Sequence, residues 1–455
     1  DLGDKSLLFN AEHPDPNDPL HKWGVDDGWG YIDAEGHEHR FIAYYTWKLW
    51  GFIEGGLGAL ANAYLYTGDP IYAHKAGVML DRLADVYPAM DWAPYAEMGW
   101  FHSDGGSGRG KIEGRIWETG DIRRLVTAYD MVADGLDDRP ELLEFLGTMA
   151  EQYDLPGEKG SVEDLHRNIE TGILRTGAEA IISGQIRGNE GMYQSAMAAV
   201  AMAFGRDPEM SDWMDWIFAA DGGRIPGIII GRIDRDGVGA EGAPSYSLGW
   251  ASNIGKLADM LADYADYDNH DIYRDYPSFA KTFAAGYSLV VLGLATPNIG
   301  DCGSTGSMGK VAADPNFIAR GYRYLHDPEI GLAAWRANDN SVEGLKPDIW
   351  AEDPNAYIDE IAAIGQAADT ADQSGGFNRT GYGLMSLERG RGSTGTALWM
   401  MYGRSFGHGH HDRLNIGVYG FGLKLSPDLG YPEFASRWPK RGEWTDNTIC
   451  HNTVI

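Results

Sequence analysis

Cysteine is almost absent from this chain, with Cys302 and Cys450 the two examples among 455 residues. Two cysteines that form no CxxC pair exclude a disulfide-stabilised scaffold, and the sequence leaves open whether they pair with each other. Runs of 18 apolar residues are also lacking, so we expect no membrane span. The chain starts at Asp1 without Met or a signal-peptide pattern, which predicts a processed N-terminus and a secreted or periplasmic protein.

Basic residues are scarce: 37 Lys and Arg stand against 67 Asp and Glu, a net charge of −30. Such a charge argues against a nucleic-acid or anionic-membrane partner. It is unevenly distributed, because residues 376–455 hold nine basic and six acidic residues, a balance of +3, and leave −33 on residues 1–375. Screening limits the reach of distant charges to about 8–10 Å, so a polyanionic substrate stays compatible with the composition.

Helical periodicity dominates the first three quarters of the sequence. Apolar residues recur at helical spacing from Ile53 to Leu65, and Thr67-Gly68-Asp69-Pro70 ends that pattern. Asp69 as N-cap and Pro70 at the first helical position predict a second helix, and thus a helical hairpin. Similar segments recur at about 118–134, 139–153, 163–183, 190–204, 208–219, 249–265, 275–293 and 354–365. Their irregular spacing excludes a fixed-period repeat and predicts a large domain of stacked helical hairpins.

The pattern changes near residue 370. Residues 366–381 have a linker-like composition, and beyond them the apolar period falls to two. The expected strands are 383–387, 397–402, 414–418, 423–425 and 448–455. We therefore predict a helical domain over 1–370 and the start of a β-sandwich over 376–455, truncated at the C-terminus.

Three of the 13 histidines lie within four positions, in the segment from Gly407 to Leu414. On a strand, His408 and His410 would share one face and His411 would take the other. Asp428 and His451 follow downstream, and two imidazoles with one carboxylate would suit zinc. Spacing alone leaves the alternatives open: a surface histidine cluster, a turn aspartate and a core histidine.

The motifs H-G-H-x-D-x-L from His408, L-x-P-D-x-G-Y from Leu425 and H-N-T from His451 follow one another in this order. As a set they resemble the C-terminal part of heparinase II/III-like polysaccharide lyases. The resemblance implies a mainly α plus β protein, an incomplete α/α toroid of helical hairpins followed by an antiparallel β-sandwich. It also implies an anionic polysaccharide as the binding partner.

Matched position by position, the resemblance implies that His408 is the catalytic histidine. It implies that His410, Asp428 and His451 hold a structural zinc, with no organic cofactor. The block from Glu241 to Tyr246 is similar to the family's E-G-x-x-x-Y block, which makes Tyr246 the catalytic tyrosine and Glu241 a substrate-binding candidate.

The segment Gln185–Gly191 lies between two predicted helices, where the family places an asparagine. The resemblance implies that Asn189 neutralises the substrate carboxylate, with Arg187 and Glu190 as substrate-binding candidates. Glu190 stands where the family often has histidine. The alternative for Asn189 is an ordinary N-cap of the helix that begins near Glu190.

These residue types suit β-elimination from a uronate polysaccharide, in which a base removes the C5 proton and the C4-linked sugar leaves. The charge that builds on the carboxyl group requires positioned donors, which an Asn amide or Arg187 supplies. Tyr246 would serve as base if a nearby cation lowered its pKa from about 10, and His408 would serve from the opposite face. Both syn and anti elimination therefore stay open.

Two other functions compete with this one. Helical toroids also host inverting glycosidases that use paired carboxylates, and acids in suitable loops are Asp26, Asp27, Asp104, Glu118, Asp121 and Glu241. A non-catalytic glycan-binding protein would use the aromatic region over residues 1–50. The acidic composition favours ulvan or alginate over a glycosaminoglycan as the substrate. The sequence does not indicate the oligomeric state.

Overall fold

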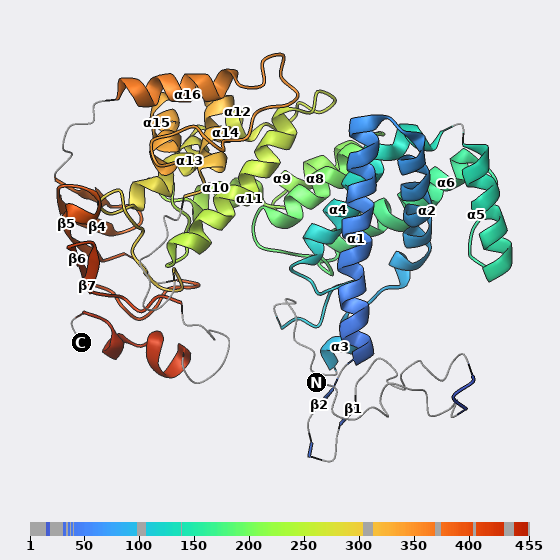
Figure 1. Cartoon of the computed structure of the whole chain (residues 1–455), viewed down its shortest axis with the longest axis horizontal. Helices are drawn as coiled ribbons and strands as arrows, with labels where there is room; N and C mark the ends of the chain where they lie inside the picture. Colours follow the sequence, from blue (N-terminus) through green and yellow to red (C-terminus); the bar gives the residue numbers. More distant parts are fainter. Residues whose placement is uncertain are drawn as a thin grey trace. The chain divides into compact units, whose positions relative to one another are not determined.

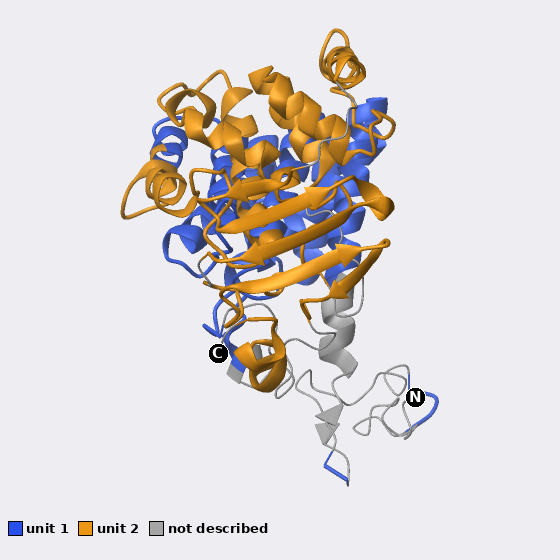
Figure 2. Ribbon diagram, turned by 90° about the vertical axis from the view of Figure 1, so that its left-hand side faces the viewer, with its two compact units in different colours: residues 1–214 blue, residues 215–455 orange. Residues whose placement is uncertain are grey.

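The computed structural model describes residues 15–18, 31–32, 35–36, 38–39, 41–97, 106–137, 139–303, 313–368, 375–403, 406–431 and 441–453. The chain divides into two compact units, Asp1–Met214 and Asp215–Ile455 (Figure 2). Unit 1 is dominated by helices, whereas unit 2 combines helices with a five-stranded sheet (Figure 1).

Unit 1 begins with the predicted hairpin, formed by α1 (Phe41–Thr67) and α2 (Pro70–Val86). The Asp69 carboxylate accepts a hydrogen bond from the Ile71 amide at 3.0 Å, and Pro70 takes the first turn, as the sequence predicts. The further elements are β1 (Tyr31–Ile32), β2 (Glu38–His39), α3 (Ala93–Glu97), α4 (Glu118–Leu136), α5 (Pro140–Tyr153), α6 (Val162–Ile169), α7 (Thr176–Ile182) and α8 (Met192–Phe204). Helix α9 (Glu209–Phe218) crosses the boundary between the units.

Helix α4 lies at the centre of the core of unit 1. Its side chains Ile122, Leu125 and Val132 are fully buried, and it packs against α1, α2 and α8. Each fully buried side chain of this size stabilises the fold by about 1.5–3 kcal/mol. Helix α6 continues through a π-helical turn at Glu170–Arg175 into α7, so the single helix predicted over 163–183 is one helical rod with a local irregularity.

In unit 2 the helices come first. They are α10 (Ile225–Arg232), α11 (Pro244–Ala262), α12 (Ile272–Asp275), α13 (Lys281–Ala285), α14 (Pro315–Leu325), α15 (Pro328–Ala337) and α16 (Ala356–Ala367). The helices expected near 249–265 and 354–365 are confirmed. A single helix over 275–293 is wrong: this segment consists of short turns around α13, and it ends in a bridge between Val291 and Ala295.

The sheet consists of β3 (Phe377–Arg379), β4 (Leu384–Arg389), β5 (Thr396–Met401), β6 (Asn415–Gly420) and β7 (Leu423–Ser426). All neighbours are antiparallel and follow the chain order, and the strands lie side by side in Figure 2. Four of the predicted strands are confirmed, and β3 lies in the segment interpreted as a linker. The strand over 448–455 is wrong at its start, because Thr448–Cys450 is a 3-10 turn closed by Cys450 N–H donating to Asn447 O.

Register explains which face of the sheet is buried. Trp399, Met401 and Tyr419 point into the core of unit 2 with Leu289 and Val291. The other face exposes the following apolar side chains of three adjacent strands: Leu387, Leu398 and Ile416. An antiparallel sheet after a helical segment is thus confirmed, and the second sheet of a sandwich stays a prediction.

The predicted domain limits, 1–370 and 376–455, also stay predictions. Helix α16 ends at Ala367 and β3 begins at Phe377. Cys302 and Cys450 are both free, which settles the question of their pairing. Among the described residues, no helix is long and apolar enough to cross a bilayer.

Candidate active site in unit 2

Two of the predicted catalytic side chains lie in direct contact. The rings of Tyr246 and His408 stack with centroids 3.5 Å apart and an interplanar angle of 9°. Tyr246 lies in the first turn of α11, after the Ala243-Pro244 start of that helix. His408 lies in the loop between β5 and β6, with 38% of its side chain exposed. The structure therefore brings together residues that are 162 positions apart.

A buried carboxylate organises the histidines. Asp301 Oδ2 lies 2.8 Å from Nδ1 of His408, and Oδ1 lies 3.0 Å from Nε2 of His410. Arg441 donates to both oxygens of the same carboxylate, at 3.2 and 2.6 Å. Burial alone would raise the pKa of Asp301, but the hydrogen bonds from His410, Arg441 and His408 outweigh it and lower the pKa to about 2.

These bonds determine what each imidazole offers. An ionised carboxylate can only accept, so Nδ1 of His408 carries the proton and Nε2 carries the lone pair. The arrangement matches the orientation of a histidine base by a buried aspartate in hydrolases. His408 is therefore held in the tautomer that a general base requires.

The histidine segment is a loop, and its assignment to a strand is wrong. Between Phe406 and Asp412 the backbone is irregular, yet His408 and His410 reach the same side because both bind Asp301. Close backbone approaches fix the loop: a Cβ at Gly300 would lie 2.5 Å from the His408 carbonyl oxygen, and one at Gly242 would lie 2.6 Å from Cα of Gly409. His411 points elsewhere, with 73% of its side chain exposed.

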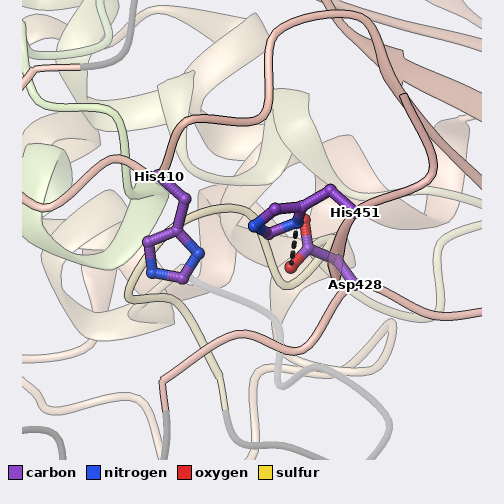
Figure 3. Close-up of side chains that lie close together, drawn as sticks. All are labelled: His410, Asp428 and His451. Carbon is purple, nitrogen blue, oxygen red and sulfur yellow. Dashed lines mark ion pairs between the residues drawn. The ribbon is translucent and has the colours of Figure 1, made fainter. Parts of the chain in front are cut away.

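The three predicted metal ligands also converge (Figure 3). His410, Asp428 and His451 are all buried, and one ligand atom from each lies within 4.8 Å of the others. In Figure 3 the ring of His451 faces both the Asp428 carboxylate, at 3.5 Å from its Nδ1, and the ring of His410. His410 and Asp428 lie in loops, and His451 directly follows the 3-10 turn Thr448–Cys450.

The surroundings of the trio fit a metal ion. Nε2 of His410 donates to Asp301, and Nε2 of His451 donates to the Thr445 carbonyl oxygen at 3.0 Å. Because each Nε2 faces an acceptor oxygen, the proton of each neutral imidazole lies on Nε2, and Nδ1 is the nitrogen free to bind a metal. Acceptors outside the ligand shell orient zinc-bound histidines in the same way. Asn415 donates its side-chain amide to Asp428 and accepts from the Asn452 amide, which fixes the carboxylate.

A second buried carboxylate, Asp412, lies close to Asp428 in this cluster. Burial raises the pKa of Asp412 to about 6, and the nearby Asp428 adds to the effect. Burial would lower the pKa of His451, but Asp428 outweighs it and the net shift is upward. Two carboxylates and two imidazoles thus lie together in a buried space. A bound dication would stabilise the ionised carboxylates there.

The pKa of Tyr246 shifts in the direction opposite to the prediction. Burial raises it well above its usual value of 10, and the neighbouring Tyr431, Asp301 and Glu241 add to the rise. The sequence led us to expect a nearby cation that lowers this pKa, whereas the main contributions all raise it. Tyr246 therefore holds its proton at neutral pH, which suits a proton donor better than a resting base.

Glu241 lies beside the same loop. A Cβ at Gly407 would come within 3.1 Å of the Glu241 side chain, so only glycine fits there without displacement. Burial raises the pKa of Glu241, and the proximity of His408 partly offsets it. A carboxylate at this place is consistent with the predicted substrate-binding role, which stays a prediction.

The remaining candidates lie in unit 1. Asn189 is exposed, and it is not the N-cap of α8, because that helix begins at Met192 with Gly191 at the cap. Arg187 and Glu190 share one partner: the Tyr193 hydroxyl accepts from Arg187 and donates to Glu190, each at 3.3 Å. The side chain of Asn189 is thus not used in a helix cap, and its catalytic role stays a prediction.

Several acids considered for a glycosidase have structural roles in unit 1. Glu118 is fully buried, and its Oε2 accepts hydrogen bonds from the amides of Lys111, Ile112 and Glu113. Asp121 is buried and pairs with Arg124. A general acid must reach its substrate, so this environment favours a structural role for Glu118. Asp26, Asp27 and Asp104 lie outside the described residues, as do most of the aromatic residues before Tyr31.

Sequence reasoning missed Asp301, Arg441 and Tyr431. Asp301 stands between Gly300 and Cys302-Gly303, and these nearby glycines were the one sequence signal of a constrained acid. In the structure both glycines have positive φ. Its distance of 107 residues from His408 left no periodic pattern to follow.

Comparisons with known proteins agree with this architecture. A heparan sulfate lyase, HepC from Pedobacter heparinus, aligns with 98% of this chain at a TM-score of 0.51 and 16% identity, and a mutant of it aligns at 0.50 and 15%. The chain has the fold of a heparan sulfate lyase. The chain spans 58% of the length of that lyase. Neither a family model nor a curated protein matches the sequence.

Proposed function

We propose that the protein is a polysaccharide lyase that cleaves a uronate-containing anionic polysaccharide by β-elimination. The observation that supports this most is the Asp301–His408–Tyr246 arrangement, a fixed base stacked on a protonated tyrosine. It occurs in a heparinase-like fold, which by itself carries no activity.

In the proposed reaction, Nε2 of His408 takes the C5 proton of the uronate. The electrons of that C–H bond form the C4–C5 double bond, and the bond from C4 to the leaving oxygen breaks. Tyr246 donates its proton to that oxygen, so the sugar leaves as an alcohol. Asp301 stabilises the imidazolium that forms, because its carboxylate remains ionised.

The charge on the uronate carboxyl group also requires stabilisation while C5 is deprotonated. We assign this role to Asn189, with Arg187 and Glu190 as substrate contacts and Glu241 as a further contact in unit 2. A substitution of Asn189 by Ala tests the assignment, because it should lower kcat by about 100-fold or more if one donor to the developing charge is lost. An unchanged kcat would remove Asn189 from the mechanism.

We further propose that His410, Asp428 and His451 bind a structural zinc. The ion would neutralise the buried carboxylates and fix the loop that carries His408. No step of the elimination is assigned to it.

The substrate class is proposed only as far as a uronate polymer. The solved lyase of the same fold, wild type and mutant, is named for heparan sulfate. The preference for ulvan or alginate expected from composition has no support in these comparisons. A secreted or periplasmic location stays a prediction.

The test is an absorbance assay on ulvan, alginate, heparin, heparan sulfate, chondroitin and hyaluronan. A lyase produces an unsaturated uronate that absorbs in the ultraviolet, whereas a hydrolase produces new reducing ends without absorbance. We expect absorbance with at least one polymer. Reducing ends without absorbance would establish a hydrolase, and binding without either product would favour a glycan-binding protein.

A further inference from the structure

Unit 2 contains a second polar surface, away from the catalytic residues. A cavity of about 750 Å³ is lined by residues of α13, α15 and the strands β3 and β4. A second cavity of about 590 Å³ adjoins it toward the end of α16. The two share the wall residues Tyr287, Gly293, Leu332, Arg336 and Arg391. We call this continuous feature the basic groove; Tyr246, His408, Asp301 and Arg441 are not among its lining residues.

The basic groove concentrates positive charge in an acidic protein. Its lining includes five cations: Arg235, Lys281, Arg336, Arg379 and Arg391. Four carboxylates accompany them: Asp236, Glu329, Asp339 and Glu388. The local balance is +1, whereas the whole chain carries −30. A lining with net positive charge is unexpected in so acidic a chain, and it favours an anionic ligand.

The cations are positioned by neutral acceptors. Arg235 donates to the Thr380 carbonyl and hydroxyl oxygens at 2.9 and 3.1 Å, and Arg379 donates to the Ser288 carbonyl at 3.1 Å. Among the described residues, neither of these arginines forms an ion pair, and the same is true of Lys281 and Arg336. The hydrogen bonds thus fix the orientation of Arg235 and Arg379, and the positive charges of all four side chains are available to a ligand.

Two of the four acids of the groove, Asp236 and Glu388, already accept hydrogen bonds from neighbouring N–H and O–H groups. Asp236 accepts from the amides of Gly381 and Tyr382. Glu388 accepts from the Leu292 amide at 3.0 Å and from the Ser386 hydroxyl at 2.8 Å. Because backbone amides already donate to Asp236 and Glu388, these two carboxylates compete only weakly for the arginines.

Aromatic faces complete the groove. Tyr287, Phe377 and Trp335 line it and are only partly buried. Arg391 lies over the backbone of Gly293, where a Cβ would come within 2.6 Å of its guanidinium, and it donates to the Tyr287 hydroxyl at 3.3 Å. Guanidinium groups match carboxylates and sulfates in geometry, and aromatic faces suit the apolar faces of sugar rings.

We propose that the basic groove is an accessory binding site for an anionic oligosaccharide segment that carries carboxylate or sulfate groups. A second contact on the same polymer raises the effective concentration of the chain at the protein. The proposal does not depend on turnover, so it survives even if the elimination chemistry is assigned wrongly.

The test measures binding in the 455-residue chain with the Tyr246→Phe substitution, so that ligand is not consumed. The probes are size-defined oligosaccharides of heparan sulfate, a sulfate-free oligogalacturonate of equal length, and neutral dextran. The groove variant is Arg336→Gln, alone and combined with Arg379→Gln. Among the described residues, the Arg336 side chain has no hydrogen-bond or ion-pair partner to lose. The matched control is Arg389→Gln, an exposed arginine at the end of β4 that does not line the groove.

We expect the double variant to weaken binding of an anionic probe by about tenfold or more, because two charge-assisted contacts are lost. Arg389→Gln should stay within about twofold, as a screened surface charge does. Comparison of the sulfated and sulfate-free probes identifies which anion the groove prefers. Thermal melting confirms that each variant is folded.

Three outcomes would overturn the proposal. They are equal affinity in folded groove and control variants, equal binding of neutral dextran, and no binding of any anionic probe. The single Arg336→Gln variant keeps the test decisive if the double variant does not fold.

Discussion

The rings of Tyr246 and His408 are stacked in parallel, with centroids 3.5 Å apart. One ring belongs to the start of α11 and the other to the loop after β5. Because Asp301 fixes the tautomer of His408 and burial keeps the proton on Tyr246, the pair would supply the base and the acid of the proposed elimination. Each element of this account makes a separate prediction.

Tyr246→Phe should abolish most of the turnover. The change removes only the hydroxyl, so kcat should fall by about 100-fold or more while KM changes little, as expected for a lost proton donor. Tyr402→Phe is the control, since its hydroxyl bonds to Asn378 away from the pair. Steady-state kinetics on the polymer found in the absorbance panel provides the measurement. A rate close to wild type would exclude Tyr246 from the chemistry.

Asp301→Asn should lower kcat by about 100-fold or more, because a neutral amide neither fixes the tautomer of His408 nor stabilises its imidazolium. The control is Asp446→Asn, whose carboxylate lies 3.8 Å from His411 and does not contact His408. Zinc content and melting temperature must be measured together with kcat, since Asp301 also binds His410. Unchanged kcat in a folded, zinc-containing variant would show that Asp301 does not position the base.

Elemental analysis of protein purified without chelator should find about one zinc per chain, the stoichiometry of a single three-residue site completed by a further ligand. His451→Ala should lose that zinc and lower the melting temperature, since a structural metal contributes directly to folding free energy. His411→Ala should keep the metal, because this exposed histidine points away from the trio. Wild-type protein without zinc would refute the site.

Stability should depend on pH through Glu118. Burial raises its pKa from 4.5 to about 7, against three backbone hydrogen bonds that lower it. Folding therefore takes up a proton between these values, and the contribution is complete below pH 4.5 and lost as the pH rises through 7. A shift of this size corresponds to about 3 kcal/mol.

Glu118→Gln should flatten this dependence, because the amide does not titrate while its oxygen can still accept from the loop amides. Glu144→Gln, at an exposed position of α5, should leave the slope unchanged. Denaturant unfolding at pH 5 and pH 8 measures the difference. Equal slopes in wild type and Glu118→Gln would assign the dependence to another group.

Local chemistry predicted much of this molecule. The Asp69-Pro70 helix start, the strands near 384–401 and the convergence of His410, Asp428 and His451 follow from periodicity, capping and motif order. Two of the predicted elements failed, one for a local reason and one for a tertiary reason. The segment 275–293 has helical spacing but contains Pro277 and Gly286, and the residues after 448 form a turn around the buried His451.

The candidate site shows the same division. His408 and Tyr246, whose rings stack, were named as candidates from their motifs, and their catalytic roles stay predictions. Asp301 was not named, because one buried aspartate among many acids has no sequence pattern. The pKa of Tyr246 was predicted in the wrong direction, since burial and the neighbouring Tyr431 are known only from the fold. Glycines at 242 and 300 mark the close approach of loops that sequence spacing could not relate.

The central claim is elimination at a uronate, and the most direct test is the ratio of products from one digest. New unsaturated uronates, counted by ultraviolet absorbance, are compared with new reducing ends in the same sample of the polymer that the enzyme degrades. The account predicts a ratio of about one for the wild type, since each elimination forms one of each. His408→Ala should lose both products together. New reducing ends with no unsaturated uronate would contradict the account and establish hydrolysis instead.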